Sequence, residues 1–293
     1  MAIRGGARCV LVLVMVLGAS LAVRAEGTQP LAVSSIRPLH LIVLALAGDR
    51  IDAREFPGIG ASPHDFVVRP SAIRLLESAR VVFWIGPELE RPLGELLERM
   101  PGRRDLALLP RMPPAAIAAD ADPHVWLDPR LATAIAESMA AALIERGIAD
   151  APQLQPRLEA FIVSMERAER NMRRELSGLE RVPFMVMHDG YGYFVRRFSL
   201  NQVLALGPDA EHQPGARAVS RMRRGALDSA AVCLLRESTS NRRLADLLAE
   251  GTAMRIREVD PLALTLPAGD ADFATFLTDF TRTVAGCLRG PAP

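Results

Sequence analysis

Short hydrophobic runs alternate with stretches of helical spacing through the first half of the chain. Apolar runs at Leu31–Ile36, Val81–Gly86 and Leu106–Leu109 predict buried strands, because such runs between turn signals are typical of strands covered on both faces. Strands that alternate with helices favour a parallel α/β sheet, so residues 26–148 are expected to form a first α/β lobe. The helices predicted in this lobe cover residues 38–47, 70–79, 89–100 and a stretch that begins near Pro129.

A single long helix is predicted to follow. Between Pro152 and Leu179 the apolar positions keep a helical period. At 1.5 Å per residue this segment would be on the order of 40 Å long, which is enough to connect two lobes as a rod. We assign residues 149–181 to this linking helix.

The alternation then resumes in residues 182–293, which predicts a second α/β lobe. Predicted strands cover 183–187, 201–206, 231–236 and 254–259, and predicted helices run through Tyr193 and near 218–227 and 241–249. A last helix is expected to pack on the sheet through an apolar face made of Phe273, Phe276, Leu277, Phe280, Val284 and Leu288.

Residues 1–25 read as a cleavable export signal. Arg4 and Arg8 precede an apolar run, and small residues ending at Ala25 give a cleavage site. Cys9 stands before most of the apolar run, whereas a lipid-anchored cysteine would follow it. No later stretch reaches the roughly 20 apolar residues that span a bilayer, so the mature protein is expected free in the periplasm or outside the cell, and we assign it to the periplasm.

Composition narrows the classes of function. The net charge is +1, and no basic run with interleaved aromatic residues suggests a nucleic-acid partner. Every basic side chain is arginine, which excludes Schiff-base and P-loop lysine mechanisms. Beyond the signal, Cys233 and Cys287 are an even count in an oxidising compartment and predict a disulfide, with two buried free thiols as the alternative.

Three of the five histidines lie in separate short motifs. His64 follows Ser62-Pro63, His124 begins the run His-Val-Trp-Leu-Asp-Pro129, and His188 begins His-Asp-Gly-Tyr-Gly-Tyr-Phe194. Neutral imidazoles gathered from distant loops are good ligands for a borderline metal such as zinc, so the trio predicts a metal site closed by the fold. The alternatives are surface or hydrogen-bonded histidines, with Asp128 only capping the next helix. His40 and His212 lack comparable settings; we assign them to a helix face near the site and to a loop.

Two carboxylates are candidates for the same site. Glu237 and Asp260, like His188, follow directly after predicted strands, where open α/β sheets present their ligand crevice. Asp260 could instead be a turn residue. Glu237 could ligate the metal, hold a water molecule, or pair with Arg236 or Arg242.

In this order, the motifs resemble the metal-binding receptors of bacterial ABC transporters, the cluster A-I solute-binding proteins, and within them the zinc-uptake branch. The match covers nearly the whole mature chain. Its segments are Gly60–Phe66 with Arg69-Pro-Ser71, Ala79–Pro87, Pro123–Pro129, His188–Phe194, Gln213–Ala216, Glu237 and Asp260–Leu262.

The resemblance implies a monomeric receptor that holds Zn²⁺ as cargo between two lobes and delivers it to a membrane permease. His64, His124 and His188 would be ligands, with Asp260 as the fourth in many members and water or Glu237 in others. Manganese and iron receptors usually carry a carboxylate at the position of His188, so an imidazole there favours zinc. Cys233 and Cys287 match a cysteine pair of zinc receptors. One departure is that Arg111–Pro123 lacks the histidine-rich loop of many zinc receptors.

Three other functions compete with this interpretation. The same receptor could carry manganese, iron or nickel. A secreted zinc hydrolase could use Glu237 as general base, although the chain has no His-Glu-x-x-His motif. An adhesin is the last alternative, and a free periplasmic location disfavours it.

Overall fold

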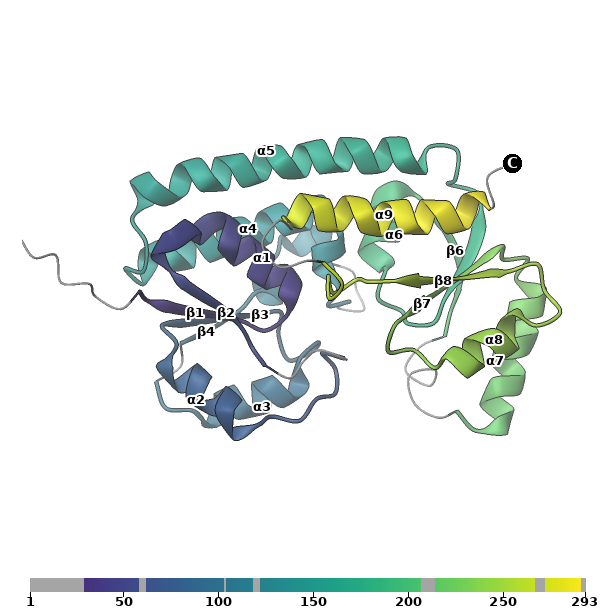
Figure 1. The fold of residues 1–293 in the computed structure, drawn as a ribbon, viewed down its shortest axis with the longest axis horizontal. Helices are drawn as coiled ribbons and strands as arrows, with labels where there is room; N and C mark the ends of the chain where they lie inside the picture. Colours follow the sequence, from purple (N-terminus) through teal and green to yellow (C-terminus); the bar gives the residue numbers. More distant parts are fainter. Residues whose placement is uncertain are drawn as a thin grey trace, which may run out of the picture.

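The structure is a computed structural model that describes residues 29–57, 62–102, 104–117, 122–206, 214–266 and 272–290. The predicted export signal and His212 lie outside these residues. Two lobes stand side by side beneath one long helix (Figure 1). Each lobe contains a four-stranded, all-parallel sheet, so the predicted fold class is confirmed.

The first sheet has the strand order β2-β1-β3-β4. Its central strands are hydrophobic and buried, as the sequence pattern predicts, while the edge strand β2 is charged and was not predicted. The strands are β1 (Leu31–Ser34), β2 (Asp52–Glu55), β3 (Val81–Trp84) and β4 (Asp105–Ala107).

The helices of this lobe lie on both faces of the sheet, with α1 and α4 on one side and α2 and α3 on the other (Figure 1). Each carries a proline in its first two positions, where the missing N–H costs no helical hydrogen bond. They are α1 (Arg37–Ala47), α2 (Pro70–Ser78), α3 (Arg91–Arg99) and α4 (Pro129–Glu145), with short 3₁₀ turns η1 (Gly48–Arg50), η2 (Leu109–Arg111), η3 (Pro114–Ala116) and η4 (Val125–Leu127).

The linking helix α5 (Ala151–Leu176) has 26 residues, about 40 Å of rise. Its buried face includes Leu154, Phe161 and Met165, and it packs against α4 of the first lobe and the last helix of the second. Pro156 lies within its second turn and removes one backbone donor. The predicted rod is therefore present, and it begins and ends inside the predicted boundaries.

The second sheet repeats the arrangement with the strand order β6-β5-β7-β8. Helix α9 buries the predicted face, from Phe273 to Leu288, against the sheet and α5. The elements are β5 (Pro183–Val186), α6 (Gly192–Phe198), β6 (Asn201–Ala205), α7 (Ala216–Asp228), β7 (Cys233–Glu237), α8 (Arg242–Ala249), β8 (Arg255–Val259) and α9 (Phe273–Arg289).

One hydrophobic core extends from the first lobe through α4, α5 and α9 into the second, and a smaller core lies beneath α7 and α8. The predicted disulfide is confirmed: it joins Cys233, the first residue of β7, to Cys287 in α9, with 5.8 Å between the Cα atoms. Within the described ranges, no helix combines the length and hydrophobicity needed to cross a membrane.

Candidate metal centre

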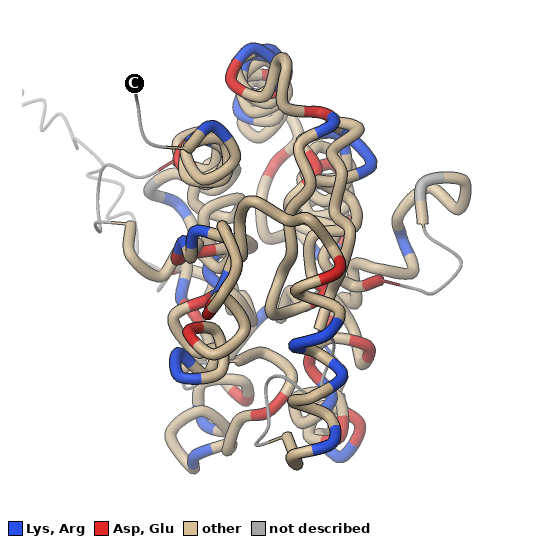
Figure 2. Tube along the Cα trace, turned by 90° about the vertical axis from the view of Figure 1, so that its right-hand side faces the viewer, with Lys and Arg blue, Asp and Glu red and all other residues tan. Residues whose placement is uncertain are grey.

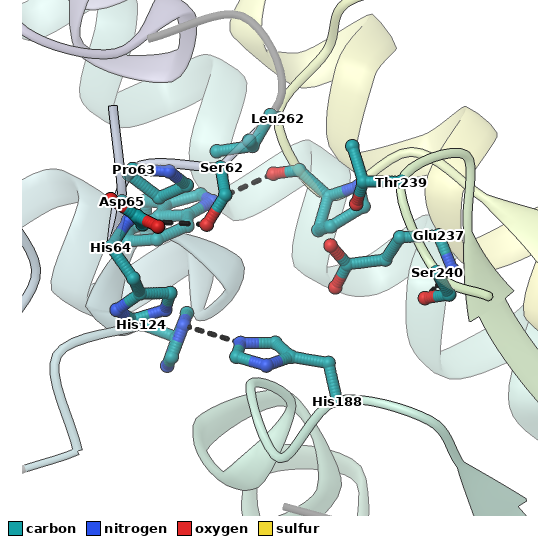
Figure 3. A pocket seen from close by; sticks show the side chains of 12 residues that line it. Ser62, Pro63, His64, Asp65, His124, His188, Glu237, Thr239, Ser240 and Leu262 are labelled. Atoms are coloured by element: carbon teal, nitrogen blue, oxygen red, sulfur yellow. Dashed lines mark hydrogen bonds between the residues drawn. The ribbon is translucent and has the colours of Figure 1, made fainter. Parts of the chain in front are cut away.

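The three predicted histidines converge between the lobes (Figure 3). His64 lies on the loop between β2 and α2, His124 directly precedes η4, and His188 lies just after β5. One ring nitrogen from each histidine can be chosen such that all three lie within 4.8 Å of one another. Among the described residues this is the one group of three or more histidine, cysteine or acidic side chains close enough to hold a metal ion.

Asp122 fixes the orientation of His124. A single carboxylate oxygen of Asp122 lies 2.8 Å from His124 Nδ1 and accepts the His124 backbone N–H at 3.0 Å. Burial alone would raise the pKa of Asp122, but the hydrogen bonds and charge of His124 outweigh it and hold the pKa below its ordinary value. An ionised Asp122 acts only as an acceptor, so Nδ1 carries the proton and the lone pair lies on Nε2.

That Nε2 faces the second lobe. It lies 2.9 Å from Nε2 of His188, so the two rings share a hydrogen bond in which His188 is the donor when His124 is neutral. A metal ion between the rings would replace the shared proton and draw on both lone pairs. The pair therefore has the chemistry of a metal site that releases a proton on binding.

Two glycines of the His188 motif make this approach possible. A Cβ atom on Gly190 would stand 2.6 Å from His188 Cδ2 and 3.0 Å from His124 Cδ2. A Cβ atom on Gly192 would stand 2.6 Å from Asp122 Oδ2. The absence of side chains at these positions thus lets the backbone of the second lobe approach the candidate ligand His124 and its partner Asp122.

A cavity of about 200 Å³ adjoins the three rings. Both lobes line it, as Figure 3 shows. Its lining residues are Ser62, Pro63, His64, Asp65, His124, Trp126, His188, Glu237, Thr239, Ser240, Pro261 and Leu262.

The two candidate carboxylates have different surroundings. Glu237 lines the cavity, and its Oε1 accepts a 2.8 Å hydrogen bond from the buried Tyr191 hydroxyl. Arg236, one of its expected partners, pairs instead with Glu258. Asp260 does not line this cavity; its Oδ2 accepts hydrogen bonds from the backbone N–H and the hydroxyl of Thr265, both at 2.7 Å. In this conformation Asp260 has the turn role that the sequence left open.

A few polar contacts hold the lobes together around the cavity. The Trp126 indole donates to the Pro261 carbonyl at 2.8 Å, and Arg197 of α6 binds Asp128 with N–O distances of 2.8 to 2.9 Å. Asp128 also caps α4 by accepting the Arg130 N–H, which confirms the predicted cap. These contacts join the lobes near the candidate metal site, away from the connection through α5.

The sequence did not indicate every residue that shapes this site. His40 is on α1, as expected, and burial lowers its pKa, but it is not part of the metal-capable group. The sequence patterns did not predict a role at the site for Asp122, Tyr191, Gly190 or Gly192. The spacing Asp122-x-His124 was the one available signal, because a carboxylate two residues from a histidine can reach its Nδ1.

Known proteins resemble the chain over most of its length. The model of the family described as zinc-uptake complex component A, periplasmic, matches residues 32–287. The chain is 28% identical to the high-affinity zinc uptake system protein ZnuA of Yersinia pestis, over 88% of this chain and 91% of that protein. The ZnuA protein of Haemophilus ducreyi is 24% identical over 87% and 92%.

Solved structures share the fold. A crystal structure of ZnuA aligns with a TM-score of 0.75 and 22% identity, covering 88% of this chain and 98% of that one. The periplasmic zinc-binding protein TroA from Treponema pallidum aligns with a TM-score of 0.78 and 20% identity, covering 89% and 99%.

Proposed function

Because the chain belongs to the family of periplasmic zinc-uptake components, whose model covers nearly the whole described chain, we propose that it binds Zn²⁺ between its lobes and delivers it to the permease of an ABC importer. The observation that carries the proposal is the convergence of His64 and His124 from one lobe with His188 from the other.

The donor set favours zinc over harder cations. Three imidazoles suit a borderline metal, whereas manganese prefers carboxylate and carbonyl oxygens. The Asp122 carboxylate that orients His124 has the outer position typical of a zinc-bound histidine. Zinc is usually bound by four ligands in a tetrahedron, so three histidine nitrogens leave one position for a further ligand. Glu237, Asp260 and water remain the candidates for it, and Glu237 is supported by its place in the cavity wall.

The division of ligands between lobes suits a carrier. A cargo site must release its ion, and a site divided between two bodies loses ligands when the bodies separate. Polar contacts between the lobes among the described residues include the His124–His188 hydrogen bond, the Trp126–Pro261 hydrogen bond, the Arg197–Asp128 pair and the 3.0 Å bond from Arg37 to the Leu266 carbonyl. Water can replace these polar contacts when the lobes separate. Export to the periplasm through residues 1–25 completes the proposal.

Metal competition tests the cargo. The mature protein, stripped of metal, is exposed to equal zinc, manganese, iron and nickel, and bound metal is measured by mass spectrometry. About one zinc per chain, with the other metals excluded, is the expected result. Dominance of manganese, iron or nickel would overturn the choice of cargo, and absence of all four would overturn the metal site.

Ligand variants test the site. His64→Ala and His188→Ala are expected to weaken zinc binding by orders of magnitude in a competition with a chromogenic chelator. His40→Gln is the matched control, because His40 is a histidine of the first lobe outside the metal-capable group. Wild-type affinity in both ligand variants would contradict the site.

A further inference from the structure

Helix α7 carries a row of exposed arginines on its outer face. Arg217, Arg221 and Arg224 recur at the spacing of one helix face, while Val219, Met222 and Ala226 on the opposite face pack into the smaller core. Arg223 differs, since it turns toward α8 and binds the Leu247 carbonyl and Glu250. Within the part of the chain that the structure describes, the three outer arginines form no ion pair.

Two further exposed arginines lie at the start of α8, which packs against α7. Arg242 and Arg243 are exposed, and they are the first two residues of the helix after its cap, Asn241. Positive side chains at a helix N-terminus are unfavourable, because the helix dipole is positive there. Neither arginine forms an ion pair with another described residue. We call the five residues Arg217, Arg221, Arg224, Arg242 and Arg243 the arginine face.

The charge is local. Residues 216–249 contain seven arginines and three acidic residues, whereas the whole chain has a net charge of only +1. Figure 2 views the molecule from the outer end of the second lobe, and both basic and acidic positions occur in its lower half. These helices lie on the side of the lobe away from α5 and α9 (Figure 1).

The loop that leads into α8 lines the metal cavity. Glu237, Thr239 and Ser240 line that cavity, and Arg242 follows Ser240 by two residues. Positive charge beside the entrance of a cation site repels the ion and slows its capture. The arginines therefore do not favour zinc capture, and as exposed side chains without an ion pair among the described residues they are available to bind an anionic surface.

We propose that the arginine face docks an acidic patch on the periplasmic surface of the permease. The inference rests on the proposed function, because delivery requires the permease to meet the receptor where the cavity opens. Opposite charges across such an interface accelerate association and fix the orientation of the partners. Contact beside the loop 237–240 would also place the permease next to one wall of the cavity.

Charge reversal at α8 tests the proposal without harming the fold. In Arg242→Glu/Arg243→Glu the new carboxylates suit the helix N-terminus, so thermal stability should not fall. The control, Arg167→Glu/Arg170→Glu, makes the same change on exposed positions of α5. Binding of the zinc-loaded receptor to the cognate permease in neutral-lipid nanodiscs is followed at low and high salt.

We expect the on-rate of the α8 variant to fall about tenfold at low salt and to lose most of its salt dependence. The control should stay within about twofold of wild type. Wild-type on-rates in the α8 variant, or an equal loss in the control, would overturn the proposal. Equal capture of wild type by empty phosphatidylglycerol nanodiscs would also overturn it, in favour of an anionic lipid surface.

Zinc affinity, measured separately by chelator competition, distinguishes this inference from the proposed function. It should be unchanged in both variants. If the wild-type receptor binds the permease in a charge-dependent way but binds no zinc, the docking role of the arginine face stands and only the proposed zinc cargo is wrong.

Discussion

Gly190 lies so close to His188 that a Cβ atom at this position would stand 2.6 Å from the imidazole Cδ2 and 2.8 Å from Nε2. The metal-capable geometry therefore depends on a residue that offers no ligand. Gly190 is buried, and the same Cβ atom would stand 3.0 Å from Cδ2 of His124, whose Nε2 lies 2.9 Å from that of His188.

Gly190→Ala is thus expected to weaken zinc binding by about tenfold or more, because it displaces two ligands. The measurement is a zinc titration in competition with a chelator. Gly286→Ala is the control, since a Cβ atom there meets no atom within 4 Å and α9 should gain stability. An unchanged zinc affinity in Gly190→Ala would show that the rings do not hold these positions when zinc binds.

Asp122 provides a second test. Asp122→Asn keeps the shape but removes the negative charge that supports His124, so zinc affinity should fall on the order of 10- to 100-fold. Asp189→Asn is the control, because Asp189 is an exposed carboxylate beside His188 whose side chain bonds Gln202 instead. Equal zinc affinities for the two variants would refute the orienting role of Asp122.

The disulfide is expected to stabilise the second lobe without affecting the metal. It closes a loop of 54 residues between β7 and α9. Cys233→Ser/Cys287→Ser should lower the free energy of unfolding by about 2–4 kcal/mol, measured in urea. Zinc affinity at a temperature where the variant is folded should stay within about twofold. An undiminished free energy of unfolding would contradict the structural role.

Glu90 gives the first lobe a dependence on pH. The side chain is fully buried beneath the ends of β1 and β3, where it accepts hydrogen bonds from the hydroxyl of Ser35 and the N–H groups of Ile85 and Gly86. Burial raises its pKa from 4.5 to about 7, against the opposing effect of these donors. The native state thus retains a proton that the unfolded chain releases at lower pH.

The stability contributed by protonated Glu90 is fully present below pH 4.5, declines as the pH rises, and is lost above about pH 7. The decline should be on the order of 2–3 kcal/mol in the free energy of unfolding. Glu90→Gln, which stays neutral, should remove this component. Urea unfolding at pH 5 and pH 8 measures it, and the same difference in both proteins would contradict the assignment.

The sequence predicted the elements whose pattern is local. Buried central strands such as Val81–Trp84 and the long amphipathic helix have periodicities that burial imposes directly. The edge strand β2 was missed because Asp52–Glu55 is mostly charged and is a strand only through its parallel pairing with β1. Its structure depends on a partner, and local sequence does not show that partner.

In the candidate site, too, the sequence predicted the residues that lie in local motifs and missed those that depend on packing. The three histidines were predicted from their motifs, and the structure brings them together. The contact of Tyr191 with Glu237 and the approach of Gly190 to His124 depend on how strands and helices pack, so no local pattern indicates them. Asp260 was a candidate because it follows a strand, but the loop after it turns back to place Thr265 on its carboxylate. Its ligation of zinc remains a prediction.

X-ray absorption at the zinc edge of the singly loaded wild-type protein tests the central claim most directly. Three imidazole nitrogens at about 2.0–2.1 Å and one oxygen ligand are the predicted coordination. The imidazole count should fall to two in His188→Ala. A wild-type spectrum with one imidazole or none would show that zinc binds elsewhere and would contradict the site between the lobes.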